Sequence, residues 1–325
     1  MPNLNLVQKT DLSSFRRIAI GTWKTAYDPS VYGSMTLHMD EAMRYMAEFR
    51  EKTGRRLTLT HMMAKAVAGV LVAAPDANAI MRWNRIYLRK DIGVFFQVAM
   101  EDKDTGQLDL SGATIHDAEK KSLVEIVDEF KTQVEKVRTQ KDEQLEGTRS
   151  MFKKIPYLLL NLVLNTIGFL TYTLNLDLRR FGIPQDPFGS VMVTNVGSLG
   201  LEAAYVPLDP YSRVPLLIAT GAVNEEPVVE DGEIRVGKVM RLFATFDHRI
   251  LDGTHAATMS KVLKEWFHDP YGHFDDLSAY AEAEEIPAAD APTEEPAAGG
   301  EEGQAVAGEG EPAPSEPAEG GAGEG

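Results

Sequence analysis

Apolar positions recur at helical spacing in several parts of the chain. Three of these parts are marked by a charged opposite face, by a proline or by a glycine that ends the helix. Residues 121–138 place apolar side chains along one stripe and charged side chains opposite, which is typical of a helix on a core surface. Residues 58–73 are apolar almost all round, which predicts a buried helix that Pro75 ends. Gly54 follows another apolar stripe as a C-terminal stop. Helices are predicted over residues 13–24, 40–52, 58–73, 121–138 and 254–267.

Strand patterns are concentrated in the second half of the chain. In the first half, residues 83–89 and 92–100 are expected to pair with each other, and residues 106–114 to form a loop and a short strand. A mixture of helices and strands of this kind predicts an α/β fold, in which helices cover one face of a mixed sheet. The other strands are predicted over residues 33–39, 190–195, 214–222 and 236–246.

One apolar segment belongs to none of the helices and strands predicted above. Residues 155–176 contain no charged side chain over 22 positions, and Lys153, Lys154, Arg179 and Arg180 flank them. That length could cross a bilayer, but a single crossing would place the two halves of one folded domain on opposite sides. Two alternatives remain: a helix or hairpin that docks on a membrane or covers an apolar acyl pocket, and an extra packing helix at a subunit interface.

Composition narrows the possible chemistry. The 325 residues include no cysteine, which excludes a disulfide framework, a thiolate metal site and a catalytic cysteine. The seven histidines show no spacing typical of a metal site, so no metal cofactor is expected. The first residues have no apolar leader segment, which favours a cytoplasmic protein with at most peripheral membrane contact.

The negative charge belongs mainly to the C-terminal tail. The chain has a formal net charge of −16, but residues 281–325 hold 13 acidic side chains and no Lys or Arg. The remainder has 36 acidic and 33 basic residues, so no nucleic-acid-binding surface is predicted. The tail is rich in Ala, Gly, Glu and Pro and is expected to be disordered.

One short motif suggests chemistry. His248 and the Asp252–Gly253 pair follow a long apolar strand and precede a helix. A histidine in a turn at a strand end can project into a cleft, and neutral imidazole suits a general base. Asp252 could fix the turn through an ion pair, and Gly253 permits tight entry into the helix. A histidine that only caps the strand is the alternative.

The wider sequence resembles a known family in the same order along the chain. The string TFDHRILDGTHAATMSKVLKEWFHDP is similar to the catalytic region of the acyltransferase component of 2-oxoacid dehydrogenase complexes. That resemblance implies a fold like that of chloramphenicol acetyltransferase, a two-layer sandwich of a mixed sheet with helices on one face. Further similar segments are SSFRRIA, RRLTLTHMMAKAVAGVLVAAPDANA, DAEKKSLVEIVDEF, GSVMVTNVGSLG and VPLLIATGAV.

The resemblance implies roles for the motif residues. His248 matches the general base, which removes a proton from an acceptor thiol or hydroxyl before the acceptor attacks an acyl thioester. Thr194 matches a hydroxyl that donates to the resulting oxyanion; from its own position it could equally be a β-branched strand residue. Asp252 is expected to pair with Arg16, or with Arg17, and so to hold the His248 turn.

Three further residues have structural expectations. Asn195 follows Thr194 and is expected to orient the turn, although a simple turn residue explains it as well. His255 is expected at the surface of the last helix. His61 lies within the apolar helix and is expected in the core or at an interface.

The resemblance also implies a domain plan. Residues 1–12 are expected to be a polar lead, residues 13–280 the catalytic domain with an apolar insertion at about 146–186, and residues 281–325 the acidic tail. The family's lipoyl and subunit-binding domains do not fit in the lead, so any lipoyl group would come from a separate protein. A homotrimer is expected, because the family's active site forms at the subunit interface.

The resulting hypothesis is a CoA-dependent acyltransferase with acyl-CoA as a substrate. The acceptor is either dihydrolipoamide on another protein or a small alcohol, amine or lipid-like molecule, and the apolar insertion favours the second. The rival hypothesis is a non-catalytic structural or scaffolding subunit of the same fold, associated with a membrane or not.

Overall fold

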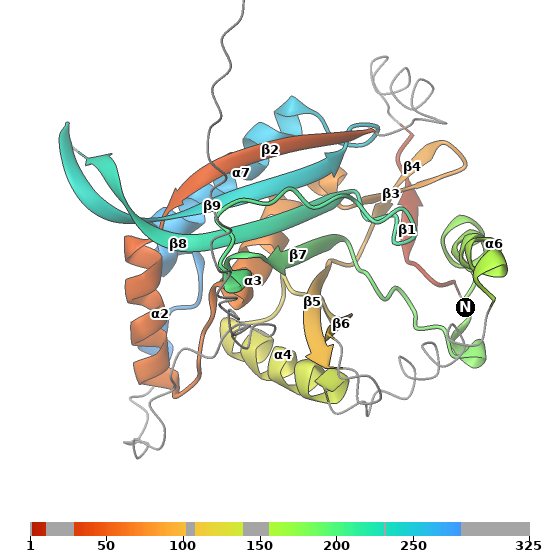
Figure 1. Cartoon of the computed structure of the whole chain (residues 1–325), viewed down its shortest axis with the longest axis horizontal. Coiled ribbons are helices and arrows are strands. Elements are labelled where there is room, and N and C mark those ends of the chain that lie inside the picture. The colour runs from red at the N-terminus through yellow and green to blue at the C-terminus, as the bar shows by residue number, and fades with distance from the viewer. Residues whose placement is uncertain (1, 11–28, 102–107, 139–155, 231, 281–325) are drawn as a thin grey trace, which may run out of the picture.

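The centre of the molecule is a six-stranded mixed sheet, whose strands are drawn as arrows with the helices beside them in Figure 1. The computed structural model describes residues 2–10, 29–101, 108–138, 156–230 and 232–280. Three neighbouring pairs, β2–β9, β9–β8 and β5–β6, are antiparallel, and β5, β7 and β8 run parallel to one another. In spatial order the strands are β2 (Ser30–His38), β9 (Glu233–Asp247), β8 (Leu216–Glu230), β7 (Val191–Asn195), β5 (Gly93–Glu101) and β6 (Leu108–His116).

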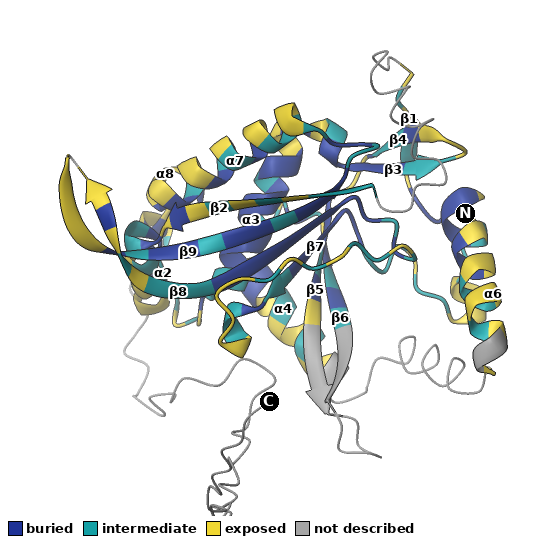
Figure 2. Ribbon diagram, turned by 45° about the horizontal axis from the view of Figure 1, so that its top comes forward, coloured by how far each residue is buried: buried dark blue, intermediate teal, exposed yellow. Residues whose placement is uncertain are grey.

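Helices cover one face of this sheet because alternate strand residues are apolar on that side. Val191 and Val193 of β7, for example, are buried in the same core cluster as Met63 and Val67. The buried residues form a continuous dark layer between the strands and helices in Figure 2. The main helices are α2 (Asp40–Thr53), α3 (Leu59–Ala73), α4 (Leu123–Arg138) and α7 (Gly253–His268). The predicted two-layer α/β architecture is therefore confirmed.

The opposite face of the sheet is covered by an irregular loop. Met192, Leu217 and Phe243 point to this side and pack against Val206 and Leu208 of that loop. Thr194 lies on the same face, two residues after Met192. Short helical turns complete the fold: η1 (Pro75–Ala77), η3 (Arg179–Phe181), η4 (Gly197–Leu199), α8 (Pro270–His273) and η5 (Leu277–Ala279).

Most predicted elements within the described residues are present. Gly54 ends α2 in a left-handed conformation, with φ of 65°. The predicted pairing of residues 83–89 with 92–100 is wrong, since the structure places β4 (Arg85–Arg89) and β5 in different sheets. The Asn78 amide explains the break, because it donates to the carbonyls of both Arg89 and Asp91 and turns the chain there. The helix predicted over 13–24 lies outside the described residues.

A small second sheet stands beside the main one. It consists of β1 (Leu6–Gln8), β4 and β3 (Ala79–Arg82), all antiparallel. The helix α6 (Tyr157–Gly168) and a π-helical turn, η2 (Phe169–Thr173), lie next to it at one flank of the molecule (Figure 1). Tyr172 packs on Leu4 and Ile80, which joins the two parts. The apolar segment of the sequence is thus folded against the small sheet.

The apolar segment is shorter as a helix than its sequence suggests. In the parts of the chain that the structure describes, no helix combines the length and the apolar character needed to cross a bilayer.

His61 is a buried base whose protonation opposes folding. Its Nδ1 accepts from the Thr58 amide at 3.2 Å, so the neutral ring carries its proton on Nε2, a buried atom with no partner among the described residues. Burial lowers the pKa of His61 from 6.5 to about 4. The unfolded chain therefore binds the proton more readily between these two pH values.

We expect the free energy of unfolding to fall by up to about 3 kcal/mol as the pH drops from 6.5 to 4. Urea denaturation at several pH values measures this fall. His61→Met removes the titrating group and should flatten the profile over this range. His38→Met changes an exposed histidine and should leave the slope unaltered, whereas equal slopes for wild type and His61→Met would refute the assignment.

Candidate active site

The turn after β9 fixes His248 at the edge of the sheet. Asp247, the last residue of β9, is buried, and its carboxylate accepts two hydrogen bonds from the Arg249 guanidinium, at 3.0 and 2.6 Å. Ile250 and Leu251 then enter the core. The charged pair and the two apolar anchors hold the backbone on both sides of His248, so the half-buried ring has a defined direction.

The His248 ring is held in one tautomer. Its Nδ1 lies 2.9 Å from the carbonyl oxygen of Leu251, which can only accept. The neutral imidazole therefore carries its proton on Nδ1, and Nε2 has the lone pair. The His248 amide also donates to the Pro29 carbonyl at 2.9 Å. A neutral imidazole with an unprotonated Nε2 is the form that a general base requires.

Asp252 begins the helix that follows. Its carboxylate accepts from the amides of Thr254 and His255, at 3.0 and 3.3 Å, as the N-cap of α7. Burial alone would raise its pKa, but hydrogen bonds from Thr254 and His255 outweigh this and hold the pKa of Asp252 well below its usual range. The predicted partners Arg16 and Arg17 lie outside the described residues. Gly253 is the exposed first residue of α7.

His255 lies closer to this site than expected. It was predicted at the surface, yet its side chain is only 18% exposed, and its Nδ1 lies 2.7 Å from Asp252 Oδ1. Its Nε2 lies 3.8 Å from Asp76, which in turn binds Lys9 Nζ at 2.6 Å. The same Nδ1 also lies 3.3 Å from the Asp252 amide, so it donates to the carboxylate in one tautomer and accepts from the amide in the other. The spacing Asp-x-x-His across a helix start was the available signal, because it is the spacing of a capping box.

Substitutions of Asp252 should separate its capping role from its charge. Asp252→Ala removes the cap and should lower the free energy of unfolding by about 1 kcal/mol. Asp252→Asn keeps an oxygen acceptor for the same amides, so most of that stability should remain. Both variants lose the charge that binds His255. Thermal unfolding of the two variants measures the difference, and equal losses would argue against the capping role.

Thr194 stands in a second cluster of polar residues, at the end of β7. Its hydroxyl donates to Gln97 Oε1 of β5 at 3.2 Å. Asn195 orients the following turn, because its Oδ1 accepts from the Ser198 amide at 3.1 Å. Gly197 in this turn packs directly on the backbone of Gly221 and Ala222, where no side chain would fit. Gln97 carries no signal in the sequence, since nothing along the chain links it to Thr194.

The structure does not bring Thr194 and His248 together within one chain. Thr194 of β7 pairs with Ala219 of the neighbouring strand β8, and Ala219 pairs in turn with Phe243 of β9. His248 lies five residues beyond Phe243, so the two are offset by roughly 17 Å along the strands and by about 10 Å across them. One chain therefore presents two separate clusters of polar side chains, one at each end of this part of the sheet.

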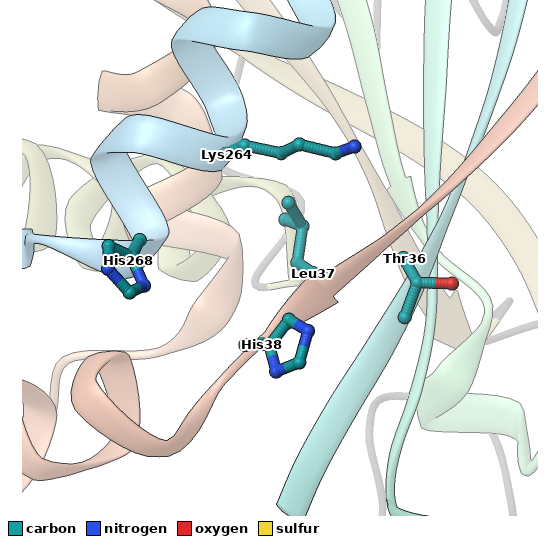
Figure 3. Close-up of a pocket in the computed structure, with 5 residues that line it drawn as sticks. All are labelled: Thr36, Leu37, His38, Lys264 and His268. Atoms are coloured by element: carbon teal, nitrogen blue, oxygen red, sulfur yellow. The ribbon is translucent and has the colours of Figure 1, made fainter. Parts of the chain in front are cut away.

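A hollow of about 290 Å³ between β2 and α7 is distinct from both clusters (Figure 3). It is lined by Thr36, Leu37, His38, Lys264 and His268. His38 pairs with Val239, whereas Ser30 at the other end of β2 pairs with Asp247. This places the hollow roughly 27 Å along the strand from His248.

The family comparison covers most of the chain. The model described as 2-oxoacid dehydrogenases acyltransferase (catalytic domain) matches residues 7–153 and 186–274. The chain belongs to this family. This match confirms the resemblance to the 2-oxoacid dehydrogenase acyltransferases that was inferred from the motifs. The clusters around His248 and around Thr194 both fall inside the matched ranges. The α6 segment, residues 154–185, is left unmatched.

A curated relative covers a similar part of the chain. The dihydrolipoyllysine-residue acetyltransferase component of the acetoin cleaving system of Bacillus subtilis is 25% identical over 222 residues. These residues are 68% of this chain and 44% of that protein. The chain thus spans a little under half the length of this relative.

Solved structures of the family share the fold. A probable dihydrolipoamide acetyltransferase from Listeria monocytogenes matches with a TM-score of 0.56 and 18% identity, over 85% of this chain and 99% of that one. The dihydrolipoamide acetyltransferase of Azotobacter vinelandii matches with a TM-score of 0.55 and 16% identity, over 82% and 93%. At this identity the likeness is one of fold.

Proposed function

We propose that this chain is an acyltransferase that moves an acyl group between CoA and an acceptor thiol or hydroxyl, with His248 as the general base. The observation that carries the proposal is the hydrogen bond from His248 Nδ1 to the Leu251 carbonyl. It leaves Nε2 as the basic nitrogen, on a ring whose turn is anchored on both sides by buried residues.

The proposed reaction needs two groups of this chain. Nε2 of His248 takes the proton of the acceptor thiol or hydroxyl, and the acceptor attacks the thioester carbonyl carbon to form a tetrahedral oxyanion. The Thr194 hydroxyl, turned away from Gln97, donates to that oxyanion. When the intermediate collapses, the bond to the CoA sulfur breaks, and the sulfur leaves as the thiol with the proton held by His248.

Two copies of the chain are needed to complete this site. Thr194 and His248 are far apart in one chain, as the strand register requires, so we infer that His248 of one subunit meets Thr194 of the next. A cyclic homotrimer provides three such sites, each using the same pair of surfaces.

One of the three residue types studied in a relative is the same here, and the other two are chemically similar. In the Azotobacter vinelandii enzyme, a serine, a histidine and an asparagine were investigated for roles in the catalytic mechanism. Here a threonine, a histidine and an aspartate stand in the same order. The asparagine of that enzyme follows its histidine by four positions, as Asp252 follows His248, which supports a positioning role for Asp252 through the His248 turn.

The acceptor is best sought among dihydrolipoyl groups first. The Bacillus subtilis relative is named for acetyl transfer on a dihydrolipoyllysine residue, which supports a lipoyl group carried by a protein as the acceptor. A small alcohol, amine or lipid-like acceptor is the second candidate, motivated by the apolar α6 segment next to the small sheet.

A thiol-release assay tests the proposal. A panel of acyl-CoAs is incubated with free dihydrolipoamide, with a lipoyl domain in its reduced form, and with small alcohols and amines. CoA release that requires both an acyl-CoA and an acceptor is the expected result. No acceptor-dependent release, together with no CoA binding by calorimetry, would favour the scaffolding alternative.

A further inference from the structure

The outer surface of α6 is apolar although it faces solvent. Leu159 and Leu162 are 49% and 63% exposed, and Phe169 follows on the same side of the helix, 39% exposed. Asn161, Asn165 and Thr166 lie among them, and none of these exposed side chains is charged. Figure 2 shows this exposed side of α6 turned away from the rest of the molecule.

Trp83 extends this surface from the small sheet. It stands at the tip of the β3–β4 hairpin, is 60% exposed, and its ring meets that of Phe169 edge-on at 5.8 Å. Trp83 and Asn84 both have positive φ, 51° and 56°, as a two-residue hairpin turn requires. Such a conformation is unfavourable for a bulky side chain. An exposed tryptophan at this position is also not stabilised by burial in the core.

The inner side of the same segment is firmly attached. The Thr173 carbonyl accepts two hydrogen bonds from Arg82, at 3.0 and 2.8 Å, and the Thr173 hydroxyl accepts from Arg213 at 2.9 Å. Asn175 Nδ2 donates to the Leu4 carbonyl at 2.7 Å. These contacts hold α6 in place without its outer apolar side chains, which therefore need another explanation.

The charges around this surface are almost all positive. Residues 79–90 and 156–182 contain six basic side chains and a single acidic one, Asp177, in a chain whose net charge is −16. Asp177 is bound by Arg179 at 2.7 Å, and the buried Arg89 is bound by Asp186. Arg85, two residues after Trp83, and Arg180, in the turn η3 that follows the α6 segment, are exposed.

We propose that Trp83, Leu159, Leu162 and Phe169 form a docking surface for an anionic lipid bilayer. Apolar and aromatic side chains on an uncharged helix, bordered by Arg and Lys, are the composition of helices that lie in the interface of a membrane. The short α6 lies along the surface rather than through the bilayer. The family model does not match this segment, so docking would be a property of this chain added to the shared catalytic domain.

Flotation with vesicles tests the docking surface. The full chain is mixed with phosphatidylcholine vesicles or with vesicles that also contain phosphatidylglycerol. We expect flotation with the anionic vesicles and a loss of flotation in 0.5 M salt, because salt screens the arginines. The double variant Leu159→Glu/Leu162→Glu should bind at least ten-fold less. Ile234→Glu, at an apolar position in the distant β8–β9 hairpin that is 78% exposed and thus more open than either leucine, should float like wild type.

A second variant distinguishes loss of membrane binding from loss of folding. Trp83→Gly suits the positive φ of the turn, so its melting temperature should equal or exceed that of wild type while its flotation falls. Failure of wild type to float, or equal flotation of all variants, overturns the proposal. A change in the number of subunits of Leu159→Glu/Leu162→Glu also overturns the proposal, because it would show that a second copy of the chain covers this surface. Acyl transfer in solution should be equal in all four proteins, so this test is independent of the proposed function.

Discussion

His248→Ala is expected to lower kcat for acyl transfer by about 10³-fold, within the range for loss of a general base. The half-buried ring stands in a turn at the sheet edge, where it hydrogen-bonds the Leu251 carbonyl of the same turn. Folding and subunit assembly should therefore persist. Steady-state rates with a saturating acceptor measure the loss, and sedimentation of the same sample reports whether assembly is intact.

Two variants sharpen this result. His248→Gln keeps a polar side chain of similar reach but supplies no base, so it should be as inactive as His248→Ala. His38→Ala changes a histidine in the hollow between β2 and α7 and should retain the wild-type rate. If His248→Ala kept more than a tenth of the activity while His38→Ala lost it, the site would have to be moved to that hollow.

Mixing two inactive variants is expected to restore activity. Thr194→Ala alone should lose about 10²-fold or more in kcat, as expected when an oxyanion donor is removed. If His248 and Thr194 of each site come from different subunits, a random mixture of His248→Ala and Thr194→Ala chains contains intact pairs. In a cyclic trimer, about one third of the sites in each ring that contains both chains would have both groups, or about one quarter over a random population that includes unmixed rings.

The mixture is prepared by joint refolding or by coexpression with two affinity tags, followed by double purification. A chain that carries both substitutions provides the control, since it cannot form an intact pair with either partner. Recovery near a third of the wild-type rate in the doubly purified rings supports a shared site. A mixture no more active than its components would mean that each chain must supply both groups itself, which the strand register opposes.

Local patterns along the sequence were sufficient for the helices and for the motif around His248. The apolar stripe of 40–52 and the stop at Gly54 are local properties, and α2 follows them closely. The family resemblance depended on strings of neighbouring residues, which comparison with the family model confirms.

Pairings between distant residues could not be predicted in the same way. The segments 83–89 and 92–100 each have strand character, but their partners depend on Asn78 and on strands formed by residues 6–8 and 191–195. The contacts of Thr194 with Gln97 and of His255 with Asp76 join positions whose proximity exists only in the folded chain.

The offset between the two polar clusters has a consequence for measurements at low concentration. If His248 of one subunit meets Thr194 of the next, as proposed from the separation of the two residues by β8, a chain diluted below the dissociation constant of its assembly would lose its active site without unfolding. Specific activity would then fall with dilution while the circular dichroism of each chain stayed the same. Subunit association, rather than the stability of the fold, would set the lowest concentration at which the proposed active site is complete.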